Sequence, residues 1–298
     1  MREQDRFRTG WRACRLVAAL AAATAAATLA ASPAAAAPSV QAHRGGTVVN
    51  GVPTYPENSM PAFRNAAADN FVIELDVKLS ADGVPMVFHD GTLERATDCE
   101  GALPERTRAE LADCRVDILG TEAKFRQLGG RDPRRAKIPT LRSVLRLLER
   151  TGARASVELA NNPGQEGFDS SGAPARVMAE VIAASDVSDR KLIVQSFWPA
   201  NLQQAREVLP AVAQSFLTLA QSNSAGPSIA DSLEAEWFSP NWPVDEADIE
   251  ESHSLGQRVV PYTLDTRADI ADAVRLDVDA IITNDPTLAR RVIRRAAG

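Results

Sequence analysis

Short apolar runs rich in β-branched residues alternate along the chain with stretches of helical periodicity. Each run has the length of a buried strand and is bounded by turn-forming residues. Nine strands are predicted, over residues 40–43, 71–77, 85–89, 155–159, 191–195, 213–217, 236–239, 258–263 and 279–283.

Capping residues predict helices between many of these strands. Ser59 can cap one helix, Thr140 precedes apolar residues at helical spacing, and Asp285 followed by Pro286 opens the last helix. A repeated strand-then-helix unit indicates a parallel sheet, either open and doubly wound or closed as a (β/α)8 barrel.

The residues after the first strand favour the closed barrel. A dinucleotide-binding open sheet would carry G-x-G-x-x-G there, whereas this chain has the sequence H-R-G-G at 43–46. The polar residues of interest also fall at strand ends, where a barrel keeps its active site. We therefore predict an α/β fold with one domain, a somewhat irregular TIM (β/α)8 barrel.

The first 37 residues have the pattern of a secretory signal peptide. Five arginines and two acids precede an alanine-rich apolar stretch at 16–31, and A-x-A cleavage sites follow it. An N-terminal membrane anchor is the alternative, but the stretch is short for a span of about 20 strongly apolar residues. We expect a signal peptide at 1–37, a barrel domain at 38–298, secretion, and no stable membrane insertion after cleavage.

Residues 91–137 interrupt the alternation with a polar, charged stretch. We interpret it as a small inserted lobe after the third strand, above the barrel mouth, because long loops are uncommon unless they are functional or disordered. It holds Cys99 and Cys114, the only cysteines left after signal removal. An oxidising compartment favours a disulfide between them; a metal-binding pair is the alternative.

The segment between Asp76 and His89 contains Asp82-Gly83 and would ordinarily form an antiparallel hairpin. A simple hairpin would carry His89 away from Asp76. We therefore expect the chain to descend without a helix and climb again in parallel, at the short limit for such a crossover.

Three acids lie within apolar strands. Glu74 and Asp76 leave the same face of one strand ~6.6 Å apart, since the rise is about 3.3 Å per residue. Glu158 is a single acid within the predicted strand at 155–159. Buried acids repel one another unless a cation compensates them. Oxygen ligands select Ca²⁺ or Mg²⁺ over zinc. The alternative is a half-exposed edge strand with solvated acids.

Two of the three histidines, His43 and His89, end apolar runs in the same manner, with Arg44 beside the first and Asp90 beside the second. One such histidine is more often structural, but the pair suits a general acid and a general base. His253 lies in a polar helical segment, and we interpret it as a surface residue.

A cation site, an arginine and two imidazoles together suit phosphoryl chemistry. A Ser-His-Asp hydrolase is the competing enzyme class, but the chain has no G-x-S-x-G motif. The net charge of −6, with no basic block, gives no support to a nucleic-acid partner. An anionic substrate would need a local positive centre.

Short motifs in a fixed order span essentially the whole chain after the signal. They are H-R-G at 43–45, P-E-N-S at 56–59, E-L-D-V at 74–77, D-G-V-P-M-V-F-H-D at 82–90, I-P-T-L at 138–141, V-E-L at 157–159, Q-S-F at 195–197, Y-T-L at 262–264 and D-A-I-I-T-N-D-P at 279–286. This series resembles the glycerophosphodiester phosphodiesterases of the PLC-like phosphodiesterase superfamily, and its first half is specific.

The resemblance implies a TIM barrel with an inserted lobe, one divalent cation (Ca²⁺ or Mg²⁺), and acid-base catalysis by the residues matching His43 and His89. It also implies hydrolysis of glycerophosphodiesters to glycerol 3-phosphate and an alcohol, with attack by water or by the glycerol 2-hydroxyl. The implied metal ligands are Glu74, Asp76 and Glu158, and the implied substrate contacts are Arg44, Glu57 and Tyr262.

The chain departs from the family pattern at three positions. Ala160 stands where a phosphate-binding Lys is common, Y-T-L-D at 262–265 replaces W-T-V-N, and Ser80 replaces Thr. The first two weaken the substrate assignment more than the mechanism. The alternatives are a phospholipase acting on membrane lipids, similar to sphingomyelinase D or phosphoinositide phospholipase C, and a non-enzymatic secreted binding module. The head group and the oligomeric state stay open.

Overall fold

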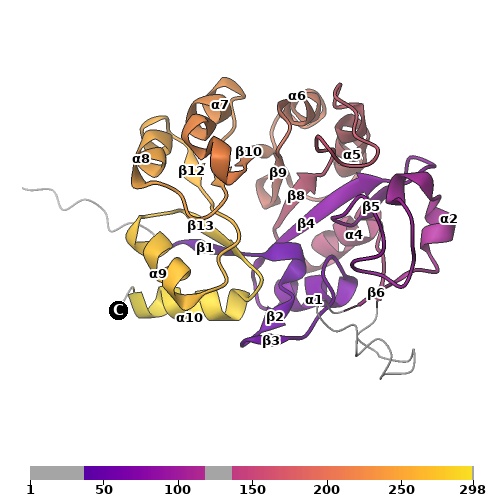
Figure 1. The fold of residues 1–298 in the computed structure, drawn as a ribbon, viewed down its shortest axis with the longest axis horizontal. Coiled ribbons are helices and arrows are strands. Elements are labelled where there is room, and N and C mark those ends of the chain that lie inside the picture. Colours follow the sequence, from indigo (N-terminus) through magenta and orange to yellow (C-terminus); the bar gives the residue numbers. More distant parts are fainter. Residues whose placement is uncertain (1–36, 118–135, 297–298) are drawn as a thin grey trace, which may run out of the picture. The chain divides into compact units, whose positions relative to one another are not determined.

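The computed structural model describes residues 37–117 and 136–296, and these residues are built around a parallel sheet that curves into a barrel (Figure 1). The strands neighbour one another in chain order, and the last returns beside the first, with Ser39 opposite Ala280. The strands are β1 (Ser39–Ala42), β4 (Val72–Leu79), β8 (Ala155–Leu159), β9 (Leu192–Ser196), β10 (Ala213–Thr218), β11 (Trp237–Pro240), β12 (Arg258–Val259) and β13 (Ala280–Thr283).

Backbone hydrogen bonds join the two ends of this row and close the barrel. The amide of Asp279 donates to the carbonyl of Val259, and the amide of Leu264 donates to the carbonyl of Ile282, both at 3.0 Å. The strand predicted over 258–263 is regular only in β12 (Arg258–Val259), yet the segment that follows β12 still bonds to β13. The predicted (β/α)8 barrel is confirmed.

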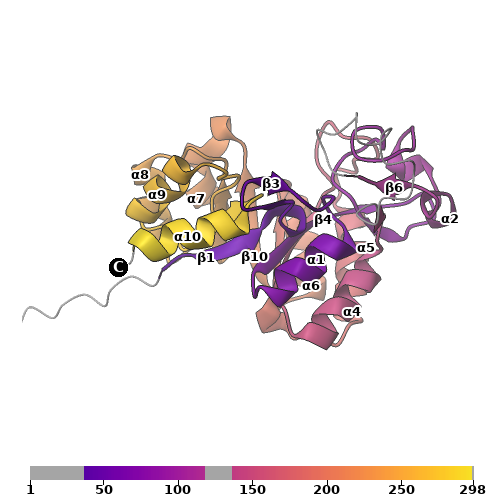
Figure 2. The same ribbon diagram turned by 90° about the horizontal axis from the view of Figure 1, so that it is seen from below.

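Helices lie outside the sheet and connect its strands (Figures 1 and 2). The predicted caps form: Ser59 and Thr140 accept from the amides of the third residue after each, and Asp285 accepts from the amide of Leu288 at 2.9 Å. The helices are α1 (Met60–Ala68), α4 (Leu141–Thr151), α5 (Ala173–Ala183), α6 (Pro199–Val208), α7 (Gly226–Ser232), α8 (Glu246–Ser254), α9 (Arg267–Arg275) and α10 (Pro286–Ala296).

Strand β4 shows how the core and the barrel interior divide the side chains. Ile73, Leu75 and Val77 are buried in the main apolar core, together with the inward faces of α4 and α5. Because side chains alternate along a strand, Glu74 and Asp76 point the other way, into the barrel. The outer apolar layer thus holds β4 in place while its other face is free to carry acids.

The predicted parallel crossover after Asp76 is wrong. Strand β5 (Pro85–Val87) pairs antiparallel with β4, with Val77 opposite Val87, and stands outside the ring of barrel strands. The hairpin is built on the last residues of β4, beyond Asp76, so the returning chain descends to the level of Asp76 instead of leaving it. The amide of Phe88 donates to the carbonyl of Asp76 at 2.9 Å, and His89 follows at once.

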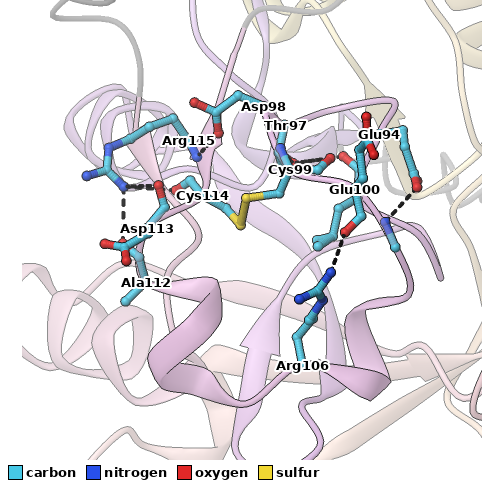
Figure 3. Close-up of a disulfide and its surroundings, with 12 residues drawn as sticks. Glu94, Thr97, Asp98, Cys99, Glu100, Arg106, Ala112, Asp113, Cys114 and Arg115 are labelled. Atoms are coloured by element: carbon cyan, nitrogen blue, oxygen red, sulfur yellow. Dashed lines mark hydrogen bonds between the residues drawn. A yellow bond between two sulfur atoms is a disulfide. The ribbon is translucent and has the colours of Figure 1, made fainter.

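The inserted lobe therefore follows the hairpin of the second barrel strand, since β5 is not a barrel strand. Its described part contains η2 (Leu103–Glu105), α2 (Arg108–Leu111), β6 (Arg115–Val116) and β7 (Ala136–Lys137). It has a small apolar core of its own, which includes Phe88, Leu93, Leu103 and Leu111. The expected bond between Cys99 and Cys114 is present, with Cα atoms 5.6 Å apart (Figure 3). Residues 118–135 of the predicted lobe lie outside the described residues.

Smaller elements complete the description: η1 (His43–Gly45), the hairpin of β2 (Val48–Val49) and β3 (Val52–Pro53), η3 (Asp189–Lys191) and η4 (Ala220–Ala225). Among the helices of the described residues, none combines the length and apolarity needed to span a bilayer. Of the predicted signal peptide at 1–37, residues 1–36 lie outside the described residues, and Ala37 is the first residue that the structure describes.

Candidate active site

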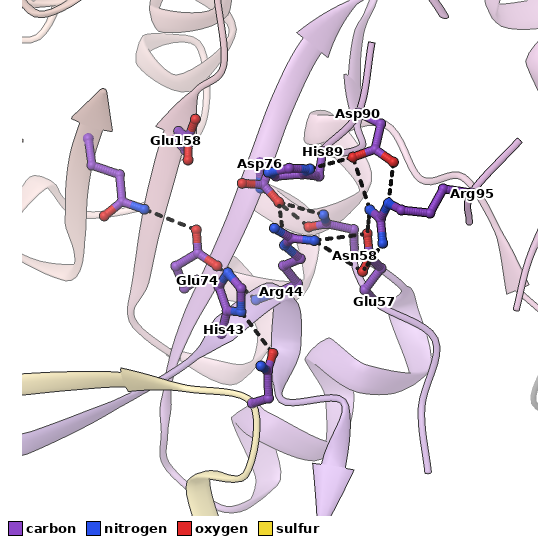
Figure 4. Close-up of polar contacts among 12 residues, drawn as sticks. His43, Arg44, Glu57, Asn58, Glu74, Asp76, His89, Asp90, Arg95 and Glu158 are labelled. Carbon is purple, nitrogen blue, oxygen red and sulfur yellow. Dashed lines mark hydrogen bonds and ion pairs between the residues drawn. The ribbon is translucent and has the colours of Figure 1, made fainter. Parts of the chain in front are cut away.

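Three carboxyl groups from two neighbouring strands meet inside the barrel (Figure 4). Each of Glu74, Asp76 and Glu158 offers one oxygen, and these oxygens lie within 4.8 Å of one another. The parallel register sets Asp76 beside Glu158. All three are at most 6% exposed. The alternative of a solvated edge strand is wrong, because β4 lies between β1 and β8.

Neutral side-chain amides orient these carboxylates. Such donors fix the direction of an acid without cancelling its charge, so the cluster keeps a demand for a cation. Three oxygen ligands at this spacing fit a hard divalent ion of the Ca²⁺ or Mg²⁺ type. The hydrogen bonds from these side-chain amides run from Gln195 to Glu74 at 3.0 Å, from Asn58 to Asp76 at 2.7 Å, and from Asn162 to Glu158 at 2.9 Å.

The crowded acids do not ionise equally. Burial and the charge of Asp76 raise the pKa of Glu74 and bring the pKa of Glu158 to about 7. Burial acts on Asp76 in the same direction, but the charges of His89 and Arg44 outweigh it and lower the pKa of Asp76 to about 2. Without a cation, therefore, Asp76 carries the charge and its neighbours tend to keep a proton.

This arrangement predicts a pH dependence of stability for the metal-free protein. A carboxyl whose pKa is higher in the folded state stabilises the fold below its unfolded pKa, near 4.5, and loses that contribution as the pH rises through about 7. In EDTA, thermal unfolding from pH 4.5 to 7.5 should show the wild type losing stability relative to Glu158→Gln. The control Glu180→Gln, on an exposed helix face, should run parallel to the wild type. Parallel curves for Glu158→Gln would contradict the raised pKa.

The His43 imidazole follows β1 and is held as a proton acceptor. Its Nδ1 lies 2.8 Å from Oδ1 of Asn284, whose Nδ2 donates to Asp265 at 2.6 Å. Because Asp265 fixes which end of the amide faces His43, Nδ1 carries the hydrogen and Nε2 is left with a lone pair. Burial, reinforced by the charge of Arg44, lowers the pKa of His43 to about 4. The ring is therefore neutral at neutral pH.

The His89 imidazole has the opposite character. Its Nδ1 donates to Oδ1 of Asp90 at 2.6 Å. Burial alone would lower the pKa of His89, but the charge of Asp76 and the hydrogen bond to Asp90 outweigh it and raise the pKa above its usual value. The site thus pairs a neutral imidazole with one that favours the protonated form.

Arg44 brings positive charge between the two imidazoles and the acids. Its backbone is in the left-handed region, with φ of 50°, which costs a non-glycine residue energy and is found at functional sites. This turn lets its amide donate to Glu74 at 2.7 Å. Its guanidinium lies 3.1 Å from Glu57 and 3.4 Å from Asp76. Arg44 thus places a positive charge beside the acids and the two imidazoles.

Two cavities meet at His43 and Arg44. The smaller, of about 100 Å³, is lined by both histidines, Arg44 and the three acids, with an apolar wall of Phe197, Leu217, Tyr262 and Ile282. The larger, of about 530 Å³, lies toward the β2–β3 hairpin and is bordered by Tyr55, Glu57, Asp265 and Asn284. The Tyr262 hydroxyl donates to the carbonyl of Thr218 at 2.8 Å, which sets its ring in the wall of the smaller cavity.

The predicted catalytic, metal-binding and substrate-contact residues all line one or both of these cavities. Glu57 differs from the others in that it lines only the larger cavity, where it accepts a hydrogen bond from Arg44. His253 lies on α8, bonds Asp279 at 3.1 Å and lines neither cavity, as expected for a surface residue.

A buried ammonium lies beside Ala160, where the family pattern has its Lys. Lys78 shares a strand face with Asp76, two residues along β4, and is 5% exposed. Its Nζ donates to the carbonyl of Ala160 at 2.7 Å and also contacts Gln165. Burial lowers the pKa of Lys78, against the charges of Glu158 and Asp76.

Sequence reasoning missed the side-chain amides that orient the acids and His43, and also one arginine of the lobe. Gln195 lies in a largely apolar strand and Asn284 directly follows a strand, so their positions carried a signal. Asn58 adopts φ of 50°, which asparagine tolerates well. Arg95 stands among other charged residues of the lobe, and no pattern marked it.

Comparisons with known proteins identify the family of the chain. Residues 43–288 match the model of the glycerophosphoryl diester phosphodiesterase family. A glycerophosphodiester phosphodiesterase of Bacillus altitudinis is 29% identical over 80% of this chain and 93% of its own, and one of Caldanaerobacter subterraneus subsp. tengcongensis is 28% identical over 86% and 98%.

Solved structures show the same fold. A putative glycerophosphoryl diester phosphodiesterase from Silicibacter pomeroyi superposes with a TM-score of 0.74 at 24% identity, covering 87% of this chain and 93% of its own. A phosphodiesterase from Oleispira antarctica, solved with the product sn-glycerol-3-phosphate, gives 0.71 at 24% identity, covering 86% and 97%. The chain therefore belongs to the glycerophosphoryl diester phosphodiesterase family and is an enzyme of that class.

Proposed function

We propose that this phosphodiesterase is secreted, depends on one divalent cation, and cuts small glycerophosphodiesters into glycerol 3-phosphate and an alcohol by acid-base catalysis between His43 and His89. The observation that carries the proposal is the pairing of these two rings around one cavity. One ring is neutral with a free lone pair and the other favours the imidazolium, and both adjoin the three carboxylates.

The protons can be assigned from this pairing. His43 accepts, at Nε2, the proton of the attacking water or glycerol 2-hydroxyl as the new bond to phosphorus forms. Attack by water gives glycerol 3-phosphate directly, whereas attack by the 2-hydroxyl gives a cyclic phosphate that a water molecule then opens to glycerol 3-phosphate. His89 donates a proton to the alcohol oxygen as its bond to phosphorus breaks. Asn284 and Asp90 hold the two rings in the tautomers that these roles need. Arg44 binds a non-bridging oxygen of the phosphate.

The carboxylates of Glu74, Asp76 and Glu158 would hold the divalent cation, Ca²⁺ or Mg²⁺. When bound, the cation neutralises charge on the phosphate oxygens. It would also relieve the repulsion that keeps protons on Glu74 and Glu158 in its absence.

The cavities indicate a small substrate. The cavity of about 100 Å³ suits a glycerol phosphate against Phe197 and Tyr262, and the larger one, open at His43 and Arg44, has room for the alcohol part. The Oleispira antarctica phosphodiesterase, which has the same fold, was solved with sn-glycerol-3-phosphate, and this supports a small product of that kind.

The test is incubation of the protein from residue 38 onward with glycerophosphocholine, glycerophosphoethanolamine and glycerophosphoinositol, with Ca²⁺, Mg²⁺ or EDTA. Release of glycerol 3-phosphate with a divalent ion, and none in EDTA, is expected. Vesicles of sphingomyelin, lysophosphatidylcholine or phosphoinositide are the comparison. Faster turnover of these lipids would favour the phospholipase alternative, and no turnover of any substrate would favour a binding module.

A matched substrate separates the two nucleophiles. An analogue of glycerophosphocholine that lacks the 2-hydroxyl keeps the same leaving group. Unchanged turnover identifies water as the attacking group, whereas loss of turnover with retained binding identifies the 2-hydroxyl. Secretion is tested separately by the N-terminal sequence of the protein exported from an expressing cell, which should begin near residue 38.

A further inference from the structure

Arg95 of the inserted lobe bridges the two halves of the site (Figure 4). Its guanidinium donates from Nη2 to Glu57 at 2.6 Å and from Nη1 to the other oxygen of Glu57 at 3.2 Å. It also donates from Nη2 to Asp90 at 3.0 Å and from Nε to the second Asp90 oxygen. One planar fork thus engages two carboxylates, a geometry that Lys cannot reproduce.

Each of these carboxylates serves a residue of the proposed mechanism. Glu57 accepts hydrogen bonds from Arg44, and Asp90 accepts the Nδ1 hydrogen of His89. Opposite charges therefore alternate along a continuous path from Arg44 through Glu57, Arg95 and Asp90 to His89. Among the described residues, the side chain of Arg95 brings the lobe into contact with the carboxylates of the site.

We propose that Arg95 is a positioning residue, which keeps Arg44 available to the phosphate and holds His89 in its donating orientation. The inference rests on the proposed roles of Arg44 and His89. It makes the lobe part of the catalytic machinery, through contacts that come from outside the barrel.

The effect on Arg44 follows from charge sharing. Both oxygens of Glu57 are shared between Arg44 and Arg95, and the Glu57 side chain is only 4% exposed. Without Arg95, the whole negative charge of this buried carboxylate falls on Arg44. An arginine neutralised in this way binds a phosphate dianion or diester less tightly, so KM and the inhibition constant of glycerol 3-phosphate should rise.

The effect on His89 follows from orientation. Arg95 donates hydrogen bonds to both oxygens of Asp90, and one of these oxygens also accepts the Nδ1 hydrogen of His89. When Arg95 is lost, Asp90 and the imidazole that it orients gain freedom to rotate. Small misplacements of a catalytic group lower the rate strongly, so kcat should fall as well.

The test compares Arg95→Ala, Arg95→Lys and the control Arg106→Ala by kcat, KM and calorimetric binding of glycerol 3-phosphate. Arg106 lies in the same lobe and donates to the carbonyl of Glu100 at 3.3 Å. We expect Arg95→Ala to lose about 10- to 100-fold in kcat/KM, with both kcat and KM affected. Arg95→Lys should recover only part of the loss, and Arg106→Ala should match the wild type.

Two further measurements separate positioning from a general loss of folding. Since the Arg95 side chain is 41% exposed, added guanidinium at a non-denaturing concentration should restore part of the activity of Arg95→Ala. Adding Glu57→Gln to Arg95→Ala should tighten glycerol 3-phosphate binding relative to the single variant, because the uncompensated charge is then gone.

The inference is overturned if Arg95→Ala keeps wild-type kcat and KM, or if Glu57→Gln weakens product binding further in the Arg95→Ala background. A wild-type protein that turns over no glycerophosphodiester would instead refute the proposed function. Product binding by the same variants, which needs no turnover, would still test the sharing of Glu57.

Discussion

His43→Ala and His89→Ala should each lower kcat on a glycerophosphodiester by about 10²- to 10⁴-fold, the usual contribution of a positioned general acid or base. Both rings adjoin the same cavity, and their fixed tautomers leave Nε2 of each for the reaction. The control His253→Ala removes the third imidazole, which lines neither cavity, and should leave kcat unchanged.

A change of leaving group distinguishes the two roles. A glycerol phosphodiester of p-nitrophenol needs no proton on its departing oxygen, so His89→Ala should be far less impaired on it than on glycerophosphocholine. His43→Ala should be equally impaired on both, because the attacking hydroxyl still needs a base. The reverse pattern would exchange the roles, and full activity of both variants would refute acid-base catalysis by these residues.

Glu158→Gln is expected to abolish most of the metal-dependent activity while leaving the metal-free fold intact. The substitution keeps the shape of the side chain and its contact with Asn162, but removes one negative ligand from the cluster. Since loss of groups that merely support metal ligands costs 10- to 100-fold in affinity or activity, loss of a ligand should cost at least about 100-fold. This loss is measured by removing bound metal with EDTA and then recording activity as a function of added Ca²⁺ or Mg²⁺ concentration.

The same variant separates loss of metal from loss of structure. Because the pKa of Glu158 is raised to about 7 by burial and by Asp76, a neutral amide at this position relieves repulsion in the metal-free state at pH 7.5. Glu158→Gln should therefore unfold at a temperature no lower than the wild type in EDTA. Asp272→Asn, a half-exposed acid on α9, is the control for activity. Wild-type metal dependence in Glu158→Gln would exclude Glu158 as a ligand.

The hairpin between Asp76 and His89 shows where reasoning from local patterns failed. The sequence correctly indicated a hairpin by its Asp82-Gly83 turn, but the assumption that β4 ends near Asp76 led to the parallel crossover. Pairing continues to Leu79, opposite Pro85. The last residues of β4 are held as strand by their pairing with β5. Because β5 comes later in the chain, the pattern within β4 does not show where that strand ends.

The acids illustrate the opposite case. Their period-two spacing within apolar strands predicted a shared inward face, and the parallel register then brought Asp76 level with Glu158. The amides that orient them come from Asn58, Gln195 and Asn162, and none of these had a spacing relative to the acids that a linear pattern could reveal.

The sequence by itself determined the alternation of strands and helices, the inward acids and the two strand-end histidines, because periodicity and chain order are local properties. Only the tertiary structure decided that β5 stands outside the barrel, that His43 is neutral while His89 favours its charge, and that Arg95 joins their partners. Those outcomes depend on burial and on charges brought together from distant positions, and neither quantity is defined until the chain has folded.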